Sequence, residues 1–265
     1  MPYYRFEDME QICTNPHLSS GNGAIVGGEY ITLRNNNKET GTGSQLHYHP
    51  NELLIFLIAG KLNAVVGKDQ RVVHPGTFIH VPPNARHQMR ATEDGPVSYL
   101  YCKDNTWPMT GIAADEAPPE QAPTVEEIQK KHAEGVWAGQ EKDASKSEAI
   151  IEGLNECFYH VMDFGEPEHS GRICSVFNGE RLSFGYYESP EGHEENDKSM
   201  AHEKFMYIMT GTMDSSIDGE KKAISSGDLL HVPQNASTSF RVTSNQARYA
   251  VFQANSFLES KINIS

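Results

Sequence analysis

The second half of this chain repeats part of the first half at a fixed offset of 151 residues. The matching pairs are Glu52 and Glu203, Gly60 and Gly211, Gly76 and Gly227, His80-Val81-Pro82 and His231-Val232-Pro233, and Asn84-Ala85 and Asn235-Ala236. A match over about forty residues without a gap indicates a duplication. Since 265 residues are enough for two domains that each bury a core, we predict two copies of one domain.

Short stretches of β-branched, aliphatic and aromatic residues run through the first copy, with glycine, asparagine or proline between them. They cover residues 24–26, 30–33, 53–59, 62–66, 72–73, 78–81 and 98–102. Short strands at regular spacing are typical of a sandwich or barrel, whereas a wound parallel sheet would need helices between its strands. The predicted fold class is therefore all-β.

Two histidines, His47 and His49, stand one residue apart just before an apolar stretch. Alternate side chains of an extended strand face the same way, so these two imidazoles point to one spot. Imidazole suits iron, copper, nickel and zinc, and a third ligand from a neighbouring strand would complete one face of a coordination sphere. We predict a metal site made by His47, His49 and His87, with its remaining positions left for substrate or water.

The histidines lie in two stretches that resemble the two motifs of the cupin superfamily. The residues that carry the resemblance are Gly41, His47, His49 and Gly60 in the first motif, and Gly76, Pro82 and His87 in the second. The resemblance implies two tandem cupin barrels, also described as double-stranded β-helices or jelly rolls. It also implies that the histidines bind a divalent metal inside the barrel.

One position departs from the family pattern, because Leu53 stands where the family's glutamate ligand is expected. Glu52 precedes it, and a shift of one residue along a strand turns a side chain to the opposite face unless a bulge re-aims it. Glu52 and His80 recur in the second copy, so structural roles are favoured for both. The second copy carries Lys198, Met200, Lys204 and Thr238 at the metal positions, so we expect the metal site to be lost there.

We predict an N-terminal barrel with the metal site over residues 1–104, a linker over 105–150 and a C-terminal barrel over 151–265. Prolines at 108, 118, 119 and 123 break the linker. Thr124 is followed three residues later by Glu127, which is the pattern of a capping box. The sequence therefore predicts a short helix over roughly residues 124–133.

The formal net charge is −14, with 36 acidic residues against 22 basic ones and no basic run. Nucleic acid and anionic membranes attract clustered Lys and Arg, so neither is expected as a partner. We find no apolar run that could span a bilayer and no signal-peptide pattern, so we expect a cytoplasmic protein. The cupin resemblance further implies a homodimer, because edge strands of cupin barrels commonly pair between subunits.

Three neutral imidazoles leave the charge of a divalent ion uncompensated, which favours an anionic chelating substrate. The site also resembles those of gentisate-type, β-diketone-cleaving and thiol dioxygenases, which are three-histidine cupins. The resemblance implies an Fe(II) dioxygenase that combines dioxygen with a small aromatic hydroxy acid or dicarbonyl and cleaves a C–C bond. The candidate substrate-binding residues are Arg34, Gln45, Arg86, Arg90 and Tyr101.

Two other hypotheses stay open. A redox-neutral isomerase, lyase or decarboxylase would use the metal as a Lewis acid together with a nearby base. A binding module would hold a small ligand without catalysis, since one fold hosts many functions. Histidine triads accept several ions, so zinc, nickel and manganese remain alternatives to iron.

Overall fold

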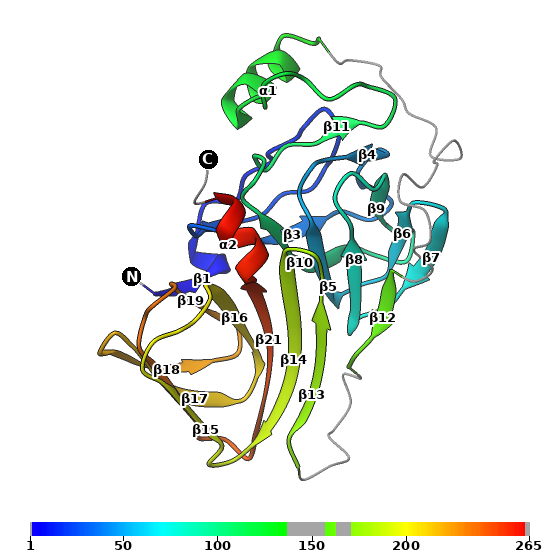
Figure 1. Cartoon of the computed structure of the whole chain (residues 1–265). Coiled ribbons are helices and arrows are strands. Elements are labelled where there is room, and N and C mark those ends of the chain that lie inside the picture. The colour runs from blue at the N-terminus through cyan, green and yellow to red at the C-terminus, as the bar shows by residue number, and fades with distance from the viewer. Residues whose placement is uncertain (1, 137–156, 163–170, 263–265) are drawn as a thin grey trace. The chain divides into compact units, whose positions relative to one another are not determined.

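The computed structural model of this chain describes residues 2–136, 157–162 and 171–262, and Figure 1 traces them. Residues 137–150 of the predicted linker and the first residues of the predicted C-terminal domain lie outside these ranges. The described residues form two β-barrels, each made of two facing sheets (Figure 1). The all-β prediction is confirmed.

The strands of the first barrel are β2 (Ile25–Gly27), β3 (Ile31–Lys38), β4 (His47–Tyr48), β5 (Leu53–Ala59), β6 (Leu62–Val66), β7 (Asp69–Val73), β8 (Thr77–Val81), β9 (His87–Ala91), β10 (Val97–Asp104), β11 (Ile112–Ala113) and β12 (Phe158–His160). They form a six-stranded sheet in the order β12-β8-β5-β10-β3-β2 and a five-stranded sheet in the order β11-β4-β9-β6-β7.

The strands of the second barrel are β1 (Tyr3–Arg5), β13 (Ile173–Asn178), β14 (Leu182–Pro190), β15 (Glu194–Asp197), β16 (Lys204–Thr210), β17 (Thr212–Ile217), β18 (Glu220–Ser225), β19 (Asp228–Val232), β20 (Thr238–Val242) and β21 (Gln246–Ala254). They form a six-stranded sheet in the order β1-β19-β16-β21-β14-β13 and a four-stranded sheet in the order β15-β20-β17-β18.

The duplicated residues occupy equivalent turns in the two barrels. Gly60 and Gly211 follow β5 and β16 with φ angles of 79° and 86°, in the left-handed region that glycine adopts without strain. A Cβ atom at either position would collide with a backbone carbonyl. Asn84 and Asn235 also have positive φ, at 63° and 65°, and asparagine tolerates this conformation better than most residues. The repeat therefore preserves the backbone of the turns.

Two edge strands pair with the barrel of the other repeat. Strand β1 pairs with β19 of the second barrel, with Tyr3 opposite Leu230. Strand β12 pairs with β8 of the first barrel, with Phe158 opposite Ile79. Each barrel therefore takes an edge strand from outside its own repeat, which supplies hydrogen-bond partners to an edge that would otherwise stay unpaired.

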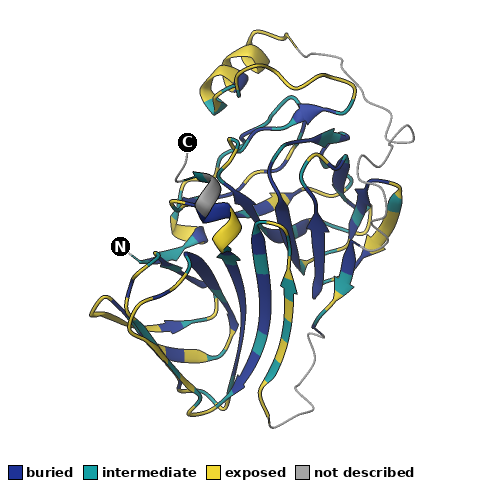
Figure 2. Cartoon of the chain, in the orientation of Figure 1, coloured by how far each residue is buried: buried dark blue, intermediate teal, exposed yellow. Residues whose placement is uncertain are grey.

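Inward-facing residues fill both barrels, as the buried strands in Figure 2 show. On β5, Leu53, Ile55 and Leu57 belong to the apolar core of the first barrel, and on β16, Met206 and Ile208 belong to that of the second. These residues alternate along their strands, as expected when alternate side chains face one side of a sheet.

The predicted linker helix is confirmed as α1 (Val125–Ala133). The Thr124 side chain accepts from the Glu127 N–H at 3.2 Å, and the Glu127 carboxylate accepts from the Thr124 N–H at 2.9 Å. A second helix, α2 (Ser256–Ile262), follows β21. No helix within the described ranges has the length and apolarity needed to cross a bilayer.

Glu203 is a buried carboxylate that accepts hydrogen bonds from the backbone between β2 and β3. It is 1% exposed and accepts hydrogen bonds from the N–H groups of Glu29, Tyr30 and Ile31 at 2.8, 2.7 and 3.0 Å. The His231 Nε2 lies 2.7 Å from the same carboxylate. These contacts lower the pKa of Glu203 against the opposing effect of burial, so the carboxylate stays ionised at neutral pH.

Replacing Glu203 with alanine is expected to lower the free energy of unfolding by about 3 kcal/mol, because buried N–H groups lose a charged acceptor. Denaturant titration followed by circular dichroism measures this change. The control is Glu191→Ala, which removes an exposed carboxylate. Equal stability of the two variants would contradict a structural role for Glu203.

Candidate metal centre

The three predicted histidine ligands meet inside the first barrel. His47 lies on β4 directly opposite His87 at the start of β9, and His49 follows β4. The His87 ring centroid lies 4.2 Å from that of His47 and 4.8 Å from that of His49. One nitrogen from each ring falls within 4.8 Å of the others, so the cluster is suited to hold a metal ion.

The backbone fixes the orientation of all three imidazoles. The Nδ1 atoms of His47, His49 and His87 lie 2.8, 3.2 and 2.9 Å from the carbonyl oxygens of Gln45, Asn51 and Ala85, respectively. A carbonyl oxygen only accepts hydrogen bonds, so each Nδ1 carries the proton and each Nε2 presents its lone pair. The three Nε2 atoms are therefore available to bind a metal ion.

The protonation state of the cluster also suits metal binding. Burial lowers the pKa of His87 to about 4, and burial holds the pKa values of His47 and His49 well below the usual range for histidine. The three rings are therefore neutral at pH 7, as metal binding requires. The buried Nε2 of His49 has no hydrogen-bond partner among the described residues. A buried polar atom without a hydrogen-bond partner is consistent with a position that binds an ion or a ligand.

Glu52 is turned away from the histidine cluster, which answers the question left open by the sequence. Its carboxylate lies 2.8 Å from the Nε2 of His80, and Glu52 is fully buried. Leu53, the next residue, lines the pocket that contains the histidines. The same type of pair, Glu203 with His231, recurs in the second barrel. Strand alternation therefore keeps the glutamate out of the ligand set.

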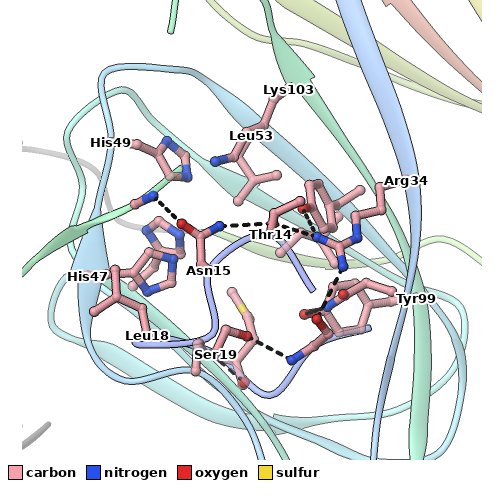
Figure 3. Close-up of a pocket in the computed structure, with 18 of the residues that line it drawn as sticks. Thr14, Asn15, Leu18, Ser19, Arg34, His47, His49, Leu53, Tyr99 and Lys103 are labelled. Atoms are coloured by element: carbon pink, nitrogen blue, oxygen red, sulfur yellow. Dashed lines mark hydrogen bonds between the residues drawn. The ribbon is translucent and has the colours of Figure 1, made fainter. Parts of the chain in front are cut away.

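All three histidines line one pocket of the first barrel (Figure 3). Its lining residues are Thr14, Asn15, Leu18, Ser19, Gly21, Arg34, Asn36, Lys38, Ser44, His47, His49, Leu53, Ile55, His87, Met89, Tyr99, Tyr101, Lys103 and Gly111. In Figure 3, His47 and His49 face Arg34 and Tyr99 across this space. None of these lining residues is an aspartate or a glutamate, whereas Arg34, Lys38 and Lys103 are basic.

The predicted substrate-binding residues are divided between the pocket and other parts of the barrel. Arg34 and Tyr101 line the pocket and hydrogen-bond to each other at 3.2 Å. Arg86 instead lies over the Tyr48 ring, with its guanidinium carbon 4.5 Å from the ring centroid. Arg90 donates to the Gly41 carbonyl at 2.9 Å. Gln45 accepts from His47 through its backbone carbonyl. Gln45, Arg86 and Arg90 are absent from the pocket lining.

Strands β3 and β10 contribute two polar rows that the sequence analysis did not identify in full. On β3 the row is Arg34, Asn36 and Lys38, and on β10 it is Tyr99, Tyr101 and Lys103. Each row follows the two-residue period of a strand. A search for polar residues at alternate positions in a predicted strand would have found both rows. Besides the Arg34–Tyr101 hydrogen bond, the two rows are joined by a hydrogen bond from the Asn36 amide to the Tyr99 hydroxyl at 2.6 Å.

The two lysines of these rows are buried cations. Lys38 is 2% exposed and Lys103 is 5% exposed. Burial lowers the pKa of each to about 7. Both amines can therefore gain or lose a proton near neutral pH, which makes them candidates for general acid–base chemistry.

The second barrel has different residue types at the positions equivalent to the histidines and Leu53. Met200 stands at the position of His49 and packs in the apolar core. Lys204 stands at the position of Leu53, and burial lowers its pKa. The cluster of His47, His49 and His87 is the only metal-ready group of three found within the described ranges.

Comparison with known proteins supports the duplicated fold. Residues 38–102 match the family model of the cupin domain, and residues 127–256 match that of the ethanolamine utilisation protein EutQ. No curated protein matches the sequence.

Several solved structures of oxalate decarboxylase are similar to the chain. One of these structures concerns substrate binding and a reaction specificity switch. It is 15% identical to this chain with a TM-score of 0.66, and the match covers 96% of this chain and 77% of the oxalate decarboxylase chain. Another, on the Mn(II) centres of the Bacillus subtilis enzyme, is 14% identical with the same TM-score and coverage. The Bacillus subtilis enzyme at pH 4.6 is 15% identical, again with a TM-score of 0.66, covering 96% and 76% of the two chains. At this identity the likeness shows the fold alone.

The two barrels and the three-histidine cluster define a bicupin with a candidate site for a divalent metal. Residues 38–102 carry a cupin domain, and the chain as a whole has a bicupin fold. The predicted cupin fold is therefore confirmed.

Proposed function

We propose that this bicupin is a metal-dependent enzyme that performs redox-neutral chemistry, as a decarboxylase, lyase or isomerase, on a small anionic substrate. The observation that carries the proposal is the position of Lys103. Its side chain is buried beside the histidine cluster and extends toward His49 (Figure 3). No hydrogen bond or ion pair joins its amine to another described residue.

The residues of the pocket have distinct roles in this proposal. His47, His49 and His87 would hold the divalent metal, which would polarise a substrate oxygen as a Lewis acid. Loss of carbon dioxide from a carboxylate leaves an electron pair on carbon, and Lys103 would donate the proton that completes the product. In an isomerisation or elimination, the same amine in its neutral form would accept a proton from carbon.

The comparisons support this reading more than the dioxygenase predicted from the resemblance. The similar solved structures are of a decarboxylase, and one of them concerns Mn(II) centres. They share the bicupin fold with this chain, and a fold alone does not fix a reaction. Lys103 adds a site-specific reason, because redox-neutral chemistry at carbon needs a group that moves protons.

A dioxygenase remains the second candidate because of the ligand set. Glu52 faces His80, so a metal bound by three neutral imidazoles keeps its full charge. An anionic substrate that chelates the metal would offset this charge and leave a position for dioxygen. Fe(II) would suit this second reaction, whereas Mn, Zn and Ni would suit the first.

Metal analysis and turnover assays separate these candidates. The protein is purified without added metal, analysed for its elements, loaded with Fe(II) or Mn(II), and incubated with small carboxylates, gentisate, salicylates, catechols, β-diketones and thiols. Product formation without oxygen uptake supports the redox-neutral enzyme. Oxygen uptake with turnover overturns it in favour of the dioxygenase, and metal binding without any turnover favours a binding module.

Replacing Leu53 with glutamate tests the charge argument. Leu53 lines the pocket, so a glutamate there is expected to reach the metal and to cancel one unit of its charge. The affinity for an anionic substrate should fall about tenfold, since charged contacts of this kind contribute roughly 1.5–3 kcal/mol. Calorimetry measures the affinity, with Leu53→Gln as the neutral control. Unchanged affinity despite spectroscopically confirmed glutamate ligation would contradict the argument.

A further inference from the structure

The pocket of the first barrel buries three basic side chains, and no carboxylate lines it. Arg34, Lys38 and Lys103 are 2%, 2% and 5% exposed. None of them forms an ion pair with a described residue, and the lining includes no carboxylate. Asp104, next to Lys103 in the chain, accepts hydrogen bonds from the backbone N–H of Glu52 and Thr106. A buried positive charge without an ion-pair partner is costly, so an anion bound in the pocket would stabilise the protonated side chains.

The two amines stand at opposite ends of this anion site. The hydrogen bonds of Arg34 with Tyr101 and of Asn36 with Tyr99 place the polar rows of β3 and β10 side by side. Lys103 follows Tyr101 at one end of the paired rows, and Lys38 follows Asn36 at the other. One amine therefore lies near the histidine cluster, while the second lies farther along the pocket wall.

The far end of the pocket has its own polar partners. The Lys38 amine donates to the Ser19 hydroxyl at 3.0 Å. Ser19 belongs to the segment 12–21, which Arg34 holds through the Thr14 hydroxyl at 2.8 Å and the Gly21 carbonyl at 3.1 Å. Arg34 also donates to the Ile12 carbonyl. Arg34 is thus a positioning residue, and two donors of Lys38 stay free to bind a ligand.

We infer that the substrate of this pocket is a small dianion, with one anionic group at the histidines and Lys103 and the second at Lys38 and Ser19. This inference rests on the proposed function for the role of the histidine end, and it assigns Lys38 as the residue that selects a second negative charge. A cavity of about 60 Å³ restricts the ligand to a small molecule. A dianion would offset both buried amines, whereas a monoanion would leave one uncompensated.

Calorimetric titration with matched ligands tests the inference. The probes are oxalate, malonate and succinate, each compared with its half-amide, which has nearly the same shape and one charge fewer. In the metal-loaded protein, the best dicarboxylate should bind about tenfold more tightly than its half-amide, since a charged hydrogen bond contributes that much or more. Phosphonoacetate against malonate reveals whether the second group is preferred as a phosphonate or a carboxylate.

The Lys38→Met variant should remove this preference. Its affinity for the dicarboxylate should fall to that for the half-amide, while its affinity for the half-amide stays within about twofold of the wild type. Lys38→Arg keeps the charge and should keep the preference. Lys61→Met, which removes an exposed lysine paired with Asp94, should change neither affinity. Thermal unfolding of each variant verifies that it is folded.

Equal affinity of the wild-type protein for dicarboxylates and half-amides would overturn the inference. An equal loss of both affinities in Lys38→Met would do the same, because Lys38 would then serve the pocket in general. The titrations are repeated on metal-free protein, and metal content is measured for every variant. A dianion preference that depends on Lys38 in a protein without turnover would support the inference while overturning the proposed enzyme.

Discussion

Replacing His87 with alanine is expected to remove most of the bound metal without unfolding the first barrel. His87 supplies one of only three candidate ligands, and no carboxylate stands nearby to replace it. Metal affinity should fall by about 100-fold or more, since even residues that only orient a ligand cost 10–100-fold when removed. Equilibrium dialysis with elemental analysis measures the affinity, and circular dichroism measures folding.

The control for this variant is His74→Ala, which removes an exposed histidine from the same barrel. It should retain wild-type metal content. Wild-type metal occupancy in the His87→Ala variant would rule out the three-histidine site. If the variant unfolds, His87→Gln, which preserves more of the side-chain volume, provides a second test.

Replacing Lys103 with methionine is expected to slow turnover strongly and to stabilise the metal-free protein. Turnover should fall by about 10²–10⁴-fold, the usual contribution of a general acid or base. The free energy of unfolding should rise by about 1–3 kcal/mol, because a methionine side chain fills similar space without the cost of a buried unpaired charge. Product assays and denaturant titration measure the two effects.

The pH dependence of the stabilisation identifies its cause. The pKa of Lys103 is about 7 in the folded protein and about 10.5 when the chain is unfolded. Between these values the unfolded wild type binds more protons than the folded form, so its stability rises with pH. The advantage of Lys103→Met should therefore be largest below pH 7 and shrink as the pH rises toward 10.

The control for the second prediction is Lys61→Met, since Lys61 is exposed. It should leave turnover and its pH dependence unchanged. Full activity of Lys103→Met would eliminate the proton-transfer role. A loss of stability instead of a gain would show that the amine has a partner that holds it in the folded protein.

The homodimer expected from the cupin resemblance stays a prediction. The molecular mass in solution at micromolar concentration tests it, and a monomeric mass would contradict it.

Sequence patterns predicted those features of the site that depend on strand alternation. His47 and His49 share a face because they are two residues apart, and Glu52 faces away because it is one residue out of step with the ligand position. Comparison of the two copies also pointed to structural roles for Glu52 and His80, which pair with each other.

Other features of the site could not be predicted from the sequence, because they depend on contacts between segments that are far apart in the chain. Arg86 and Arg90 flank a ligand in the sequence, but their side chains reach Tyr48 and Gly41 instead of the pocket. Lys38 and Lys103 enter the pocket from strands that are far apart in the chain and adjacent in the sheet.

A pair of barrels could be predicted from the sequence alone, because the duplicated glycines and asparagines specify the same turns twice. The same comparison predicted which barrel carries the histidine cluster, because the second copy has lysine, methionine and threonine at the equivalent positions. The structure was needed to show that β1 and β12 complete barrels outside their own repeats, and that basic side chains line the pocket without a carboxylate. Local periodicity fixes the direction of a side chain, whereas its neighbours and its burial depend on the packing of the whole barrel.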